Sequence, residues 1–333
     1  MAHGQSSKSP RFEIRNYVTE SFNHELSRDV FTGLTADRKS IPSKYFYDKR
    51  GSKLYEQICK LPEYYLTRTE LSILQEKAEV IMEPFETGDL VELGSGANWK
   101  ISKLIDASDS PQGAHIRYVP VDVSESALIA ASKDLLTNYP KLRVLGIVAD
   151  FTRHMEVIPD DSAKLIIFFG STIGNLTEAE SQHFLRNVAN ALQPEDRFLI
   201  GLDMIKPKNI LEAAYNDAQG VTSAFNKNIL QVINRELHAD FDPSDFEHRA
   251  FYNGEQEQVE MYLQATRKTI VEIKDLDLSV AFEKGETIHT EICRKFSEES
   301  ALKMFSEVGL KVERWFSDPK GWFSLVEVAE NTF

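Results

Sequence analysis

Short runs of apolar residues recur at regular intervals between residues 90 and 202. Each run is four or five residues long, which suits a strand that is buried on both faces. Amphipathic stretches lie between the runs, so the alternation predicts βαβ units around a parallel sheet. The predicted strands are residues 90–93, 118–121, 144–148, 165–169 and 198–202.

Two stretches carry the signature of a helix start. Thr67 with Glu70, and Thr177 with Glu180, have the spacing of a capping box, with each threonine as the N-cap residue. Both stretches are therefore predicted as helices, and the second should end before Pro194, because proline cannot continue a helix. The apolar positions at helical spacing are Leu71, Leu74, Ala78 and Ile81 in the first stretch and Phe184, Val188, Ala191 and Leu192 in the second.

The pattern changes after about residue 206. The segments 259–263 and 276–282 alternate apolar and polar residues, as half-exposed strands do. The segments 313–317 and 322–328 flank an Asp-Pro-Lys-Gly turn and predict a β-hairpin. We therefore expect a doubly wound α/β sheet closed by a hairpin, as in class I (Rossmann-like) methyltransferases, with an inserted antiparallel region.

A glycine turn follows the first predicted strand, in the sequence Asp-Leu-Val-Glu-Leu-Gly-Ser-Gly at residues 89–96. Glycine lets the backbone approach a ligand closely, and the next helix offers free N–H groups. A dinucleotide fingerprint would need a third glycine where Trp99 stands. A strand with an acid near its end and a relaxed G-x-G is instead the usual opening of an S-adenosylmethionine site, although a turn without a ligand has the same pattern.

Acidic residues follow the next two strands. Asp122 is placed to accept hydrogen bonds from ribose hydroxyls, and Asp150 from the adenine amine, with the ring of Phe151 packed on the base. Each acid alone could be a strand-end residue without a role, and Lys100 could be a solvated helix residue. Together they predict a cofactor site formed by Gly94, Lys100, Asp122, Asp150 and Phe151.

Composition and charge limit the classes of molecule that this protein is expected to bind. The 333 residues are 42% hydrophobic and 27% charged, as in globular proteins with one large or two medium domains. The 52 acidic and 38 basic residues give a net charge of −14, which repels a polyanion, so we expect no nucleic-acid partner. No apolar run reaches the ~20 residues of a membrane span. The substrate is therefore expected to be a small molecule.

Two cysteines, Cys59 and Cys293, are too few for a disulfide framework or a zinc cluster. His183 and His248, with no metal-ligand spacing, are expected to be solvated. The polar residues 1–10 lack the apolar core of a signal peptide. These features predict a cytoplasmic protein without a metal site.

Longer motifs resemble those of the L-histidine Nα-methyltransferases of ergothioneine biosynthesis, over roughly residues 28–328. The resemblance implies S-adenosylmethionine as methyl donor and three successive transfers that convert histidine to its trimethylammonium betaine, hercynine. The motifs are Tyr-Phe-Tyr-Asp at 45–48, Leu-Pro-Glu-Tyr-Tyr-x-Thr-Arg at 61–68, Val-Glu-Leu-Gly-Ser-Gly at 91–96, Gly-Ser-Thr-Ile-Gly-Asn-Leu-Thr at 170–177, Gly-Val-Thr-x-x-Phe-Asn-x-Asn at 220–228, Val-Ile-Asn-Arg-Glu-Leu at 232–237 and Glu-Met-x-Leu at 260–263.

The resemblance also implies two domains. A substrate-binding α+β domain would comprise residues 14–68 and 205–295, and the methyltransferase domain residues 69–204 and 296–333. Residues 1–13 would form a disordered tail. We expect the protein to be a monomer.

The resemblance assigns substrate roles to individual residues. Tyr64, Asn175 and Glu291 would contact the imidazole ring, and Tyr215 would belong to a carboxylate clamp. The remaining pocket residues would be Tyr47, which positions the amine, Gly170, in the turn facing the transferred methyl group, and Met261 and Cys293. Cys293 departs from the resemblance, since the family usually has a serine there, and a thiol is a weaker hydrogen-bond partner.

Several alternatives remain from the sequence. Without the resemblance, Tyr64 could be a core aromatic residue and Glu291 an acid at a strand edge. The same chemistry on tryptophan or a modified derivative is a second hypothesis, which Cys293 leaves open. A noncatalytic binding paralogue is a third, although such a protein would not need polar residues at Asp122 and Asp150.

Overall fold

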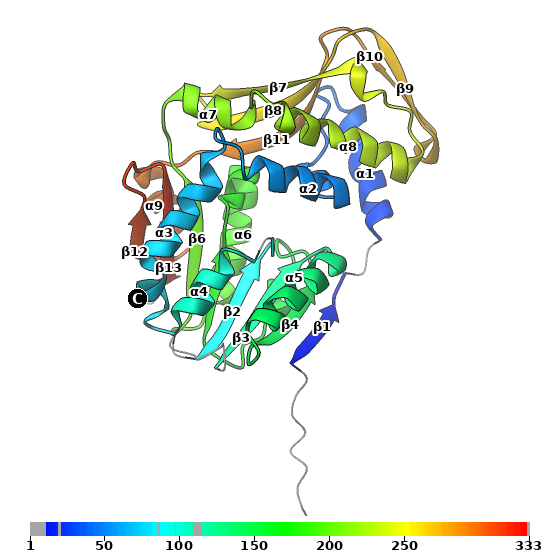
Figure 1. Ribbon diagram of the computed structural model, residues 1–333. Helices are drawn as coiled ribbons and strands as arrows, with labels where there is room; N and C mark the ends of the chain where they lie inside the picture. Colours follow the sequence, from blue (N-terminus) through cyan, green and yellow to red (C-terminus); the bar gives the residue numbers. More distant parts are fainter. Residues whose placement is uncertain (1–10, 19–20, 86, 97, 109–114, 332–333) are drawn as a thin grey trace, which may run out of the picture.

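The structure is a computed structural model that describes residues 11–18, 21–85, 87–96, 98–108 and 115–331. An eight-stranded sheet forms its lower part in Figure 1, with the strand order β1-β4-β3-β2-β5-β6-β13-β12. β1 to β6 run parallel, and β13 and β12 join antiparallel as a hairpin. The strands are β1 (Phe12–Asn16), β2 (Gly88–Leu93), β3 (Ile116–Asp122), β4 (Arg143–Val148), β5 (Lys164–Phe168), β6 (Arg197–Asp203), β12 (Leu310–Ser317) and β13 (Phe323–Glu330).

The five predicted strands and the closing hairpin are confirmed, and this topology is the class I methyltransferase fold. Alternate residues of each central strand enter two different cores, as Ile166 and Ile167 of β5 show. One core lies under α3 (Tyr65–Met82) and α4 (Ile101–Ala107), and the other under α6 (Glu178–Ala191) and α9 (Glu298–Ser306). Burial on both faces explains why these strands read as continuous apolar runs.

Strand β1 corrects the predicted N-terminal boundaries. Residues 12–13 were assigned to the tail and 14–16 to the substrate domain, but Phe12–Asn16 pairs in parallel with β4 at the sheet edge. Phe12 and Ile14 are half-buried there, and Arg11 donates to carbonyl groups at the end of α5 (Glu125–Asn138). Residues 1–10 of the expected tail lie outside the described residues.

The two predicted capping boxes have opposite outcomes. Thr177 and Glu180 form a complete capping box at the start of α6, which ends at Ala191 as predicted. The box at Thr67 is wrong, because α3 already begins at Tyr65 and Thr67 is buried within it. Glu70 instead accepts a hydrogen bond from the Gly170 amide and pairs with Lys100.

A second layer covers the carboxyl ends of the parallel strands (Figure 1). It combines an N-terminal segment with the region between β6 and α9, and the predicted antiparallel strands of the insertion are confirmed. No described helix is long and apolar enough to cross a membrane. The elements of the second layer are α1 (Phe22–Thr35), α2 (Lys49–Ile58), α7 (Lys208–Tyr215), α8 (Val221–Leu237), β7 (Phe246–Asn253), β8 (Gln258–Ala265), β9 (Thr269–Ile273), β10 (Leu278–Phe282) and β11 (Thr287–Arg294).

Candidate active site

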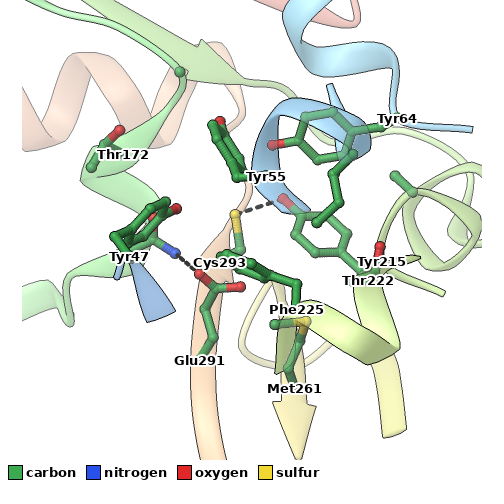
Figure 2. Close-up of a pocket in the computed structure, with 14 residues that line it drawn as sticks. Tyr47, Tyr55, Tyr64, Thr172, Tyr215, Thr222, Phe225, Met261, Glu291 and Cys293 are labelled. Carbon is green, nitrogen blue, oxygen red and sulfur yellow. Dashed lines mark hydrogen bonds between the residues drawn. The ribbon is translucent and has the colours of Figure 1, made fainter. Parts of the chain in front are cut away.

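A pocket lies where the second layer meets the turn after β5. It encloses about 510 Å³ of space that no atom fills, including the open solvent at its mouth. Aromatic and polar side chains face one another across it (Figure 2). The lining residues are Tyr47, Tyr55, Ile58, Tyr64, Gly170, Thr172, Asn175, Ala214, Tyr215, Thr222, Phe225, Met261, Glu291 and Cys293.

All eight residues predicted for the substrate site line this pocket, although they come from segments far apart in the sequence. Their individual roles stay predictions. Among the residues that sequence reasoning missed, Thr222 and Phe225 lie in a quoted motif and so had a signal. The only sequence signal for Tyr55 was its place on the apolar face of α2, the face that packs on α8.

Glu291 and Asn175 form the polar side of the pocket. The Asn175 side-chain amide donates to the Glu291 carboxyl at 3.1 Å and to the Ile292 carbonyl at 2.8 Å. The pairing of β11 with β8 shifts register between His289 and Glu291, and this bulge turns Glu291 into the pocket beside Met261. Burial raises the pKa of Glu291 to about 7, opposed by Lys295 and Asn175.

An aromatic wall, defined here as Tyr47, Tyr55 and Phe225, forms another side. The ring of Tyr47 lies 5.6 Å from that of Tyr55 and 5.5 Å from that of Phe225, both edge to face. Tyr47 remains 48% exposed, which places it at the mouth of the pocket. The wall is therefore an electron-rich surface that is open to solvent at one end.

The neighbouring residues Tyr64 and Tyr65 diverge. Tyr64 lines the pocket with its ring 6.2 Å from that of Tyr215, whereas the Tyr65 hydroxyl donates to Asp203 at 2.8 Å behind the pocket. Burial raises the pKa of Tyr64 and of Tyr215 well above the ordinary value. Both hydroxyls therefore stay protonated at neutral pH and can donate hydrogen bonds.

His248 corrects the expectation that it is solvated. It is buried on β7, with Nδ1 2.9 Å from the Asn226 amide nitrogen and Nε2 2.9 Å from the Tyr215 carbonyl oxygen. Burial lowers its pKa, so the ring is neutral at pH 7. It therefore holds the backbone of Tyr215 in place, a role that sequence spacing gave no sign of.

The residues predicted for the cofactor meet at one edge of the sheet. Gly94 follows β2, Asp122 ends β3 and Asp150 follows β4, and these strands are neighbours. The Lys100 ammonium lies 2.5 Å from the Glu70 carboxylate and 5.4 Å from the ring centre of Phe169. The alternative that Lys100 is a solvated helix residue is therefore wrong.

At this edge the glycine turn is open and the two carboxylates are held in place. Gly94 has a φ of +70°, and a Cβ at Gly96 would meet nothing within 4 Å, so the turn leaves open space. Asp122 accepts from the Ser124 amide at 2.8 Å, and Asp150 from the Thr152 amide at 2.9 Å. Each carboxylate is thus fixed by its own turn, and burial raises the pKa of Asp122 to about 6.

No three His, Cys, Asp or Glu side chains lie close enough to hold a metal ion within the described part of the chain.

A family model described as histidine-specific, S-adenosylmethionine-dependent methyltransferase matches residues 26–330. The chain belongs to this family. The histidine N-alpha-methyltransferase of Mycolicibacterium smegmatis (strain ATCC 700084 / mc(2)155) is 43% identical over 313 residues, which are 94% of this chain and 97% of that protein. The protein of the same name from Mycobacterium tuberculosis (strain CDC 1551 / Oshkosh) is 40% identical over 316 residues, 95% of this chain and 98% of that protein.

A fungal relative is more distant. Ergothioneine biosynthesis protein 1 of Schizosaccharomyces pombe (strain 972 / ATCC 24843) is 29% identical over 289 residues, which cover 81% of this chain and 37% of that protein. The family resemblance inferred from the motifs is therefore confirmed, and the methyltransferase fold agrees with it.

Proposed function

We propose that this protein transfers methyl groups from S-adenosylmethionine to the α-amine of L-histidine, giving hercynine, as a step of ergothioneine biosynthesis. The observation that carries the proposal is the hydrogen bond from the Asn175 amide to the buried carboxyl of Glu291, which lines the same pocket as Tyr64. Two relatives above 39% identity, both called histidine N-alpha-methyltransferase, support it.

The polar side of the pocket suits an imidazole ring. A neutral imidazole offers one N–H donor and one nitrogen acceptor. Ionised Glu291 can accept from the first, and the protonated Tyr64 hydroxyl can donate to the second. An indole has a donor but no acceptor, so it would offer the Tyr64 hydroxyl no partner. Sites built on such pairing discriminate by up to ~10⁴–10⁵-fold.

The cofactor fits the other end of the site. S-adenosylmethionine, when bound, supplies an electrophilic methyl group on a sulfonium. We propose that it is held by Gly94, Lys100, Asp122, Asp150 and Phe151, with Gly170, in the turn after β5, between the cofactor and the pocket. Lys100 supports this position, because its ammonium would lie 3.7 Å from a Cβ at Gly170.

The residues around the amine have to align it and tolerate its growth. The amine must lose its proton before it can attack, and alignment can contribute ~7–11 kcal/mol. Tyr47, exposed at the pocket mouth, would position the amine rather than act as a buried base. The aromatic wall accommodates added methyl groups, and its faces attract a methylated ammonium by cation–π interaction.

The layers of the fold correspond to this division of work. We propose that the second layer, from about residue 22 to 68 together with 205–295, binds the amino acid and that the sheet domain binds the methyl donor. A small substrate rather than a nucleic acid agrees with the net charge of −14.

Mass spectrometry of the protein incubated with S-adenosylmethionine and all twenty amino acids tests the function. We expect histidine alone to gain methyl groups, up to three. Methylated tryptophan would keep the chemistry and change the substrate. The absence of any product with the free amino acids would contradict the proposal.

A further inference from the structure

Two buried lysines share one carboxylate behind a second wall of the pocket, defined here as Tyr215 and Cys293 and called the wall in this subsection. Asp203, at the end of β6, is fully buried, with Lys206 Nζ 2.5 Å from Oδ1 and Lys295 Nζ 2.8 Å from Oδ2. Within the described residues, neither lysine has another carboxylate within 4 Å. With both lysines protonated, the group therefore carries one positive charge that no described partner neutralises, and a buried charge without a partner is unfavourable.

The two lysines differ in what they touch. Lys206 contacts Tyr65, Asp203 and the Met204 carbonyl, all behind the wall. Lys295 Nζ lies 2.9 Å from Tyr215 Oη and 3.0 Å from Cys293 Sγ, and both of these residues line the pocket. The uncompensated charge thus reaches the pocket only through the contacts of Lys295.

Lys295 fixes the direction of the hydrogen bonds in the wall. An ammonium can only donate, so Tyr215 Oη and Cys293 Sγ must both accept from it. These two atoms lie 2.8 Å apart (Figure 2), and a single hydrogen can bridge them. Of the hydroxyl and thiol hydrogens, one therefore remains free to point into the pocket.

The protonation states agree with this arrangement. Burial alone lowers the pKa of Lys295, but the negative charge of Asp203 opposes this effect, and the pKa rises to about 12. Burial lowers the pKa of Lys206, with Lys295 adding to the shift. Burial also raises the pKa of Cys293, so the thiol keeps its proton at pH 7.

We propose that Lys295, held by Asp203, is a positioning residue. By donating to both Tyr215 and Cys293, it leaves one hydrogen of this pair free to donate to the carboxylate of the amino-acid substrate. Glu291, the acid of the pocket, accepts from Asn175 and does not neutralise the lysine pair. A substrate carboxylate at the wall would neutralise it. Cys293 can take the place of the usual serine in this arrangement, because the charge of Lys295 behind it strengthens the weak thiol donor. The inference rests on the proposed function, since it requires an amino-acid substrate.

Comparison of L-histidine with L-histidinamide, which keeps the imidazole and the amine but has no charged carboxylate, tests the inference. For each compound, kcat/KM and the dissociation constant in the presence of S-adenosylhomocysteine are measured in the wild type and in Lys295→Met. We expect the variant to lose about 10–100-fold for histidine, mainly in KM, and less than about threefold for the amide, because a hydrogen bond to a charged group is worth about 1.5–3 kcal/mol. A merely structural role would reduce both compounds equally.

Lys206→Met is the matched control, because it removes a charge from the same carboxylate without touching the wall. We expect it to lower the histidine-to-histidinamide ratio of kcat/KM less than Lys295→Met does, because it removes the net charge but leaves the hydrogen-bond donor in the wall in place. We expect Lys295→Arg to restore part of the ratio. If Lys295→Met does not fold, Tyr215→Phe takes its place and should lower the same ratio. An unchanged ratio in Lys295→Met, or in Tyr215→Phe where that variant replaces it, would overturn the inference.

The wild type separates this outcome from a failure of the proposed function. A wild type that binds histidine, with a Lys295→Met ratio equal to that of the wild type, rejects only the role of Lys295. A wild type that binds no free amino acid rejects the proposed function and this inference together.

Discussion

At the scale of single residues, buried acids carry most of the chemistry that we propose. Glu291 has one described side-chain donor, Asn175, and lies in a pocket whose other polar side is formed by tyrosine hydroxyls. An ionised carboxylate in such surroundings needs a further donor, and an imidazole N–H provides one. Selectivity for histidine should therefore depend on this carboxylate more than on the shape of the pocket.

Substitution of Glu291 should separate substrate binding from cofactor binding. We expect Glu291→Ala to lower kcat/KM for histidine by about 10–100-fold or more, because a charged hydrogen bond worth about 1.5–3 kcal/mol is lost. S-adenosylhomocysteine affinity, measured by calorimetry, should change less than about threefold. Glu291→Gln, which keeps the volume and the Asn175 neighbour, is the matched control and should lie between. An equal loss of both ligands would contradict the assignment.

Glu92 gives a prediction on stability and pH. It is buried on β2 and accepts from the Tyr118 hydroxyl, and burial raises its pKa to about 7, whereas the unfolded value is about 4.5. The folded state therefore prefers the protonated acid, and the stabilisation present below pH 4.5 is lost as the pH rises through 7. Glu92→Gln removes this dependence and keeps an oxygen that can accept from Tyr118.

Urea unfolding of both proteins at pH 5 and pH 8 measures the effect of Glu92. The free energy of unfolding of Glu92→Gln minus that of the wild type should rise between these pH values, by up to an amount on the order of 3 kcal/mol. Other groups cancel in the difference. A difference that stays constant with pH would show that the pKa of Glu92 is not raised.

At the scale of elements, the sequence predicts what depends on local pattern and misses what depends on tertiary contact. β2 to β6 were predicted because burial on both faces makes them apolar, whereas β1 is a half-exposed edge strand with alternating charges. The start of α3 was misplaced because Glu70, at capping-box spacing, serves a contact between distant segments. Lys295 was missed for the same reason, since its partner Asp203 lies 92 positions earlier.

The contacts of α3 predict a strong coupling between Glu70 and Lys100. Their side chains are 0% and 14% exposed, so Glu70→Gln leaves the ammonium largely buried without its counter-ion. We expect a loss of about 3–5 kcal/mol in the free energy of unfolding, measured by urea denaturation. Lys100→Met in the same background removes the stranded charge and should recover part of the loss. Strictly additive effects would show that the pair is not coupled.

At the scale of the whole molecule, the pocket lies between two layers, and residues of both layers line it. Gly170, Thr172 and Asn175 come from the sheet side, while Tyr55, Phe225 and the rest belong to the layer above it. The sequence resemblance predicted which residues meet here, because ordered motifs preserve a site. It did not predict the ion pairs of Asp203 with Lys206 and Lys295, which lie where the two layers meet.

A ligand that bridges the two layers should stabilise both against unfolding. At 100 times its dissociation constant, a ligand that binds only the folded state adds about 2.7 kcal/mol, which corresponds to roughly 3–4 °C in Tm for a chain of this length. With S-adenosylhomocysteine present, we expect L-histidine to raise Tm by this amount in differential scanning calorimetry. L-tryptophan at the same concentration should raise Tm by less than about 1 °C, because the indole offers the Tyr64 hydroxyl no acceptor and places a carbon edge against Glu291 or Asn175. An equal shift with both amino acids would show that the polar side of the pocket does not select the ring, and a larger shift with tryptophan would assign the site to that amino acid.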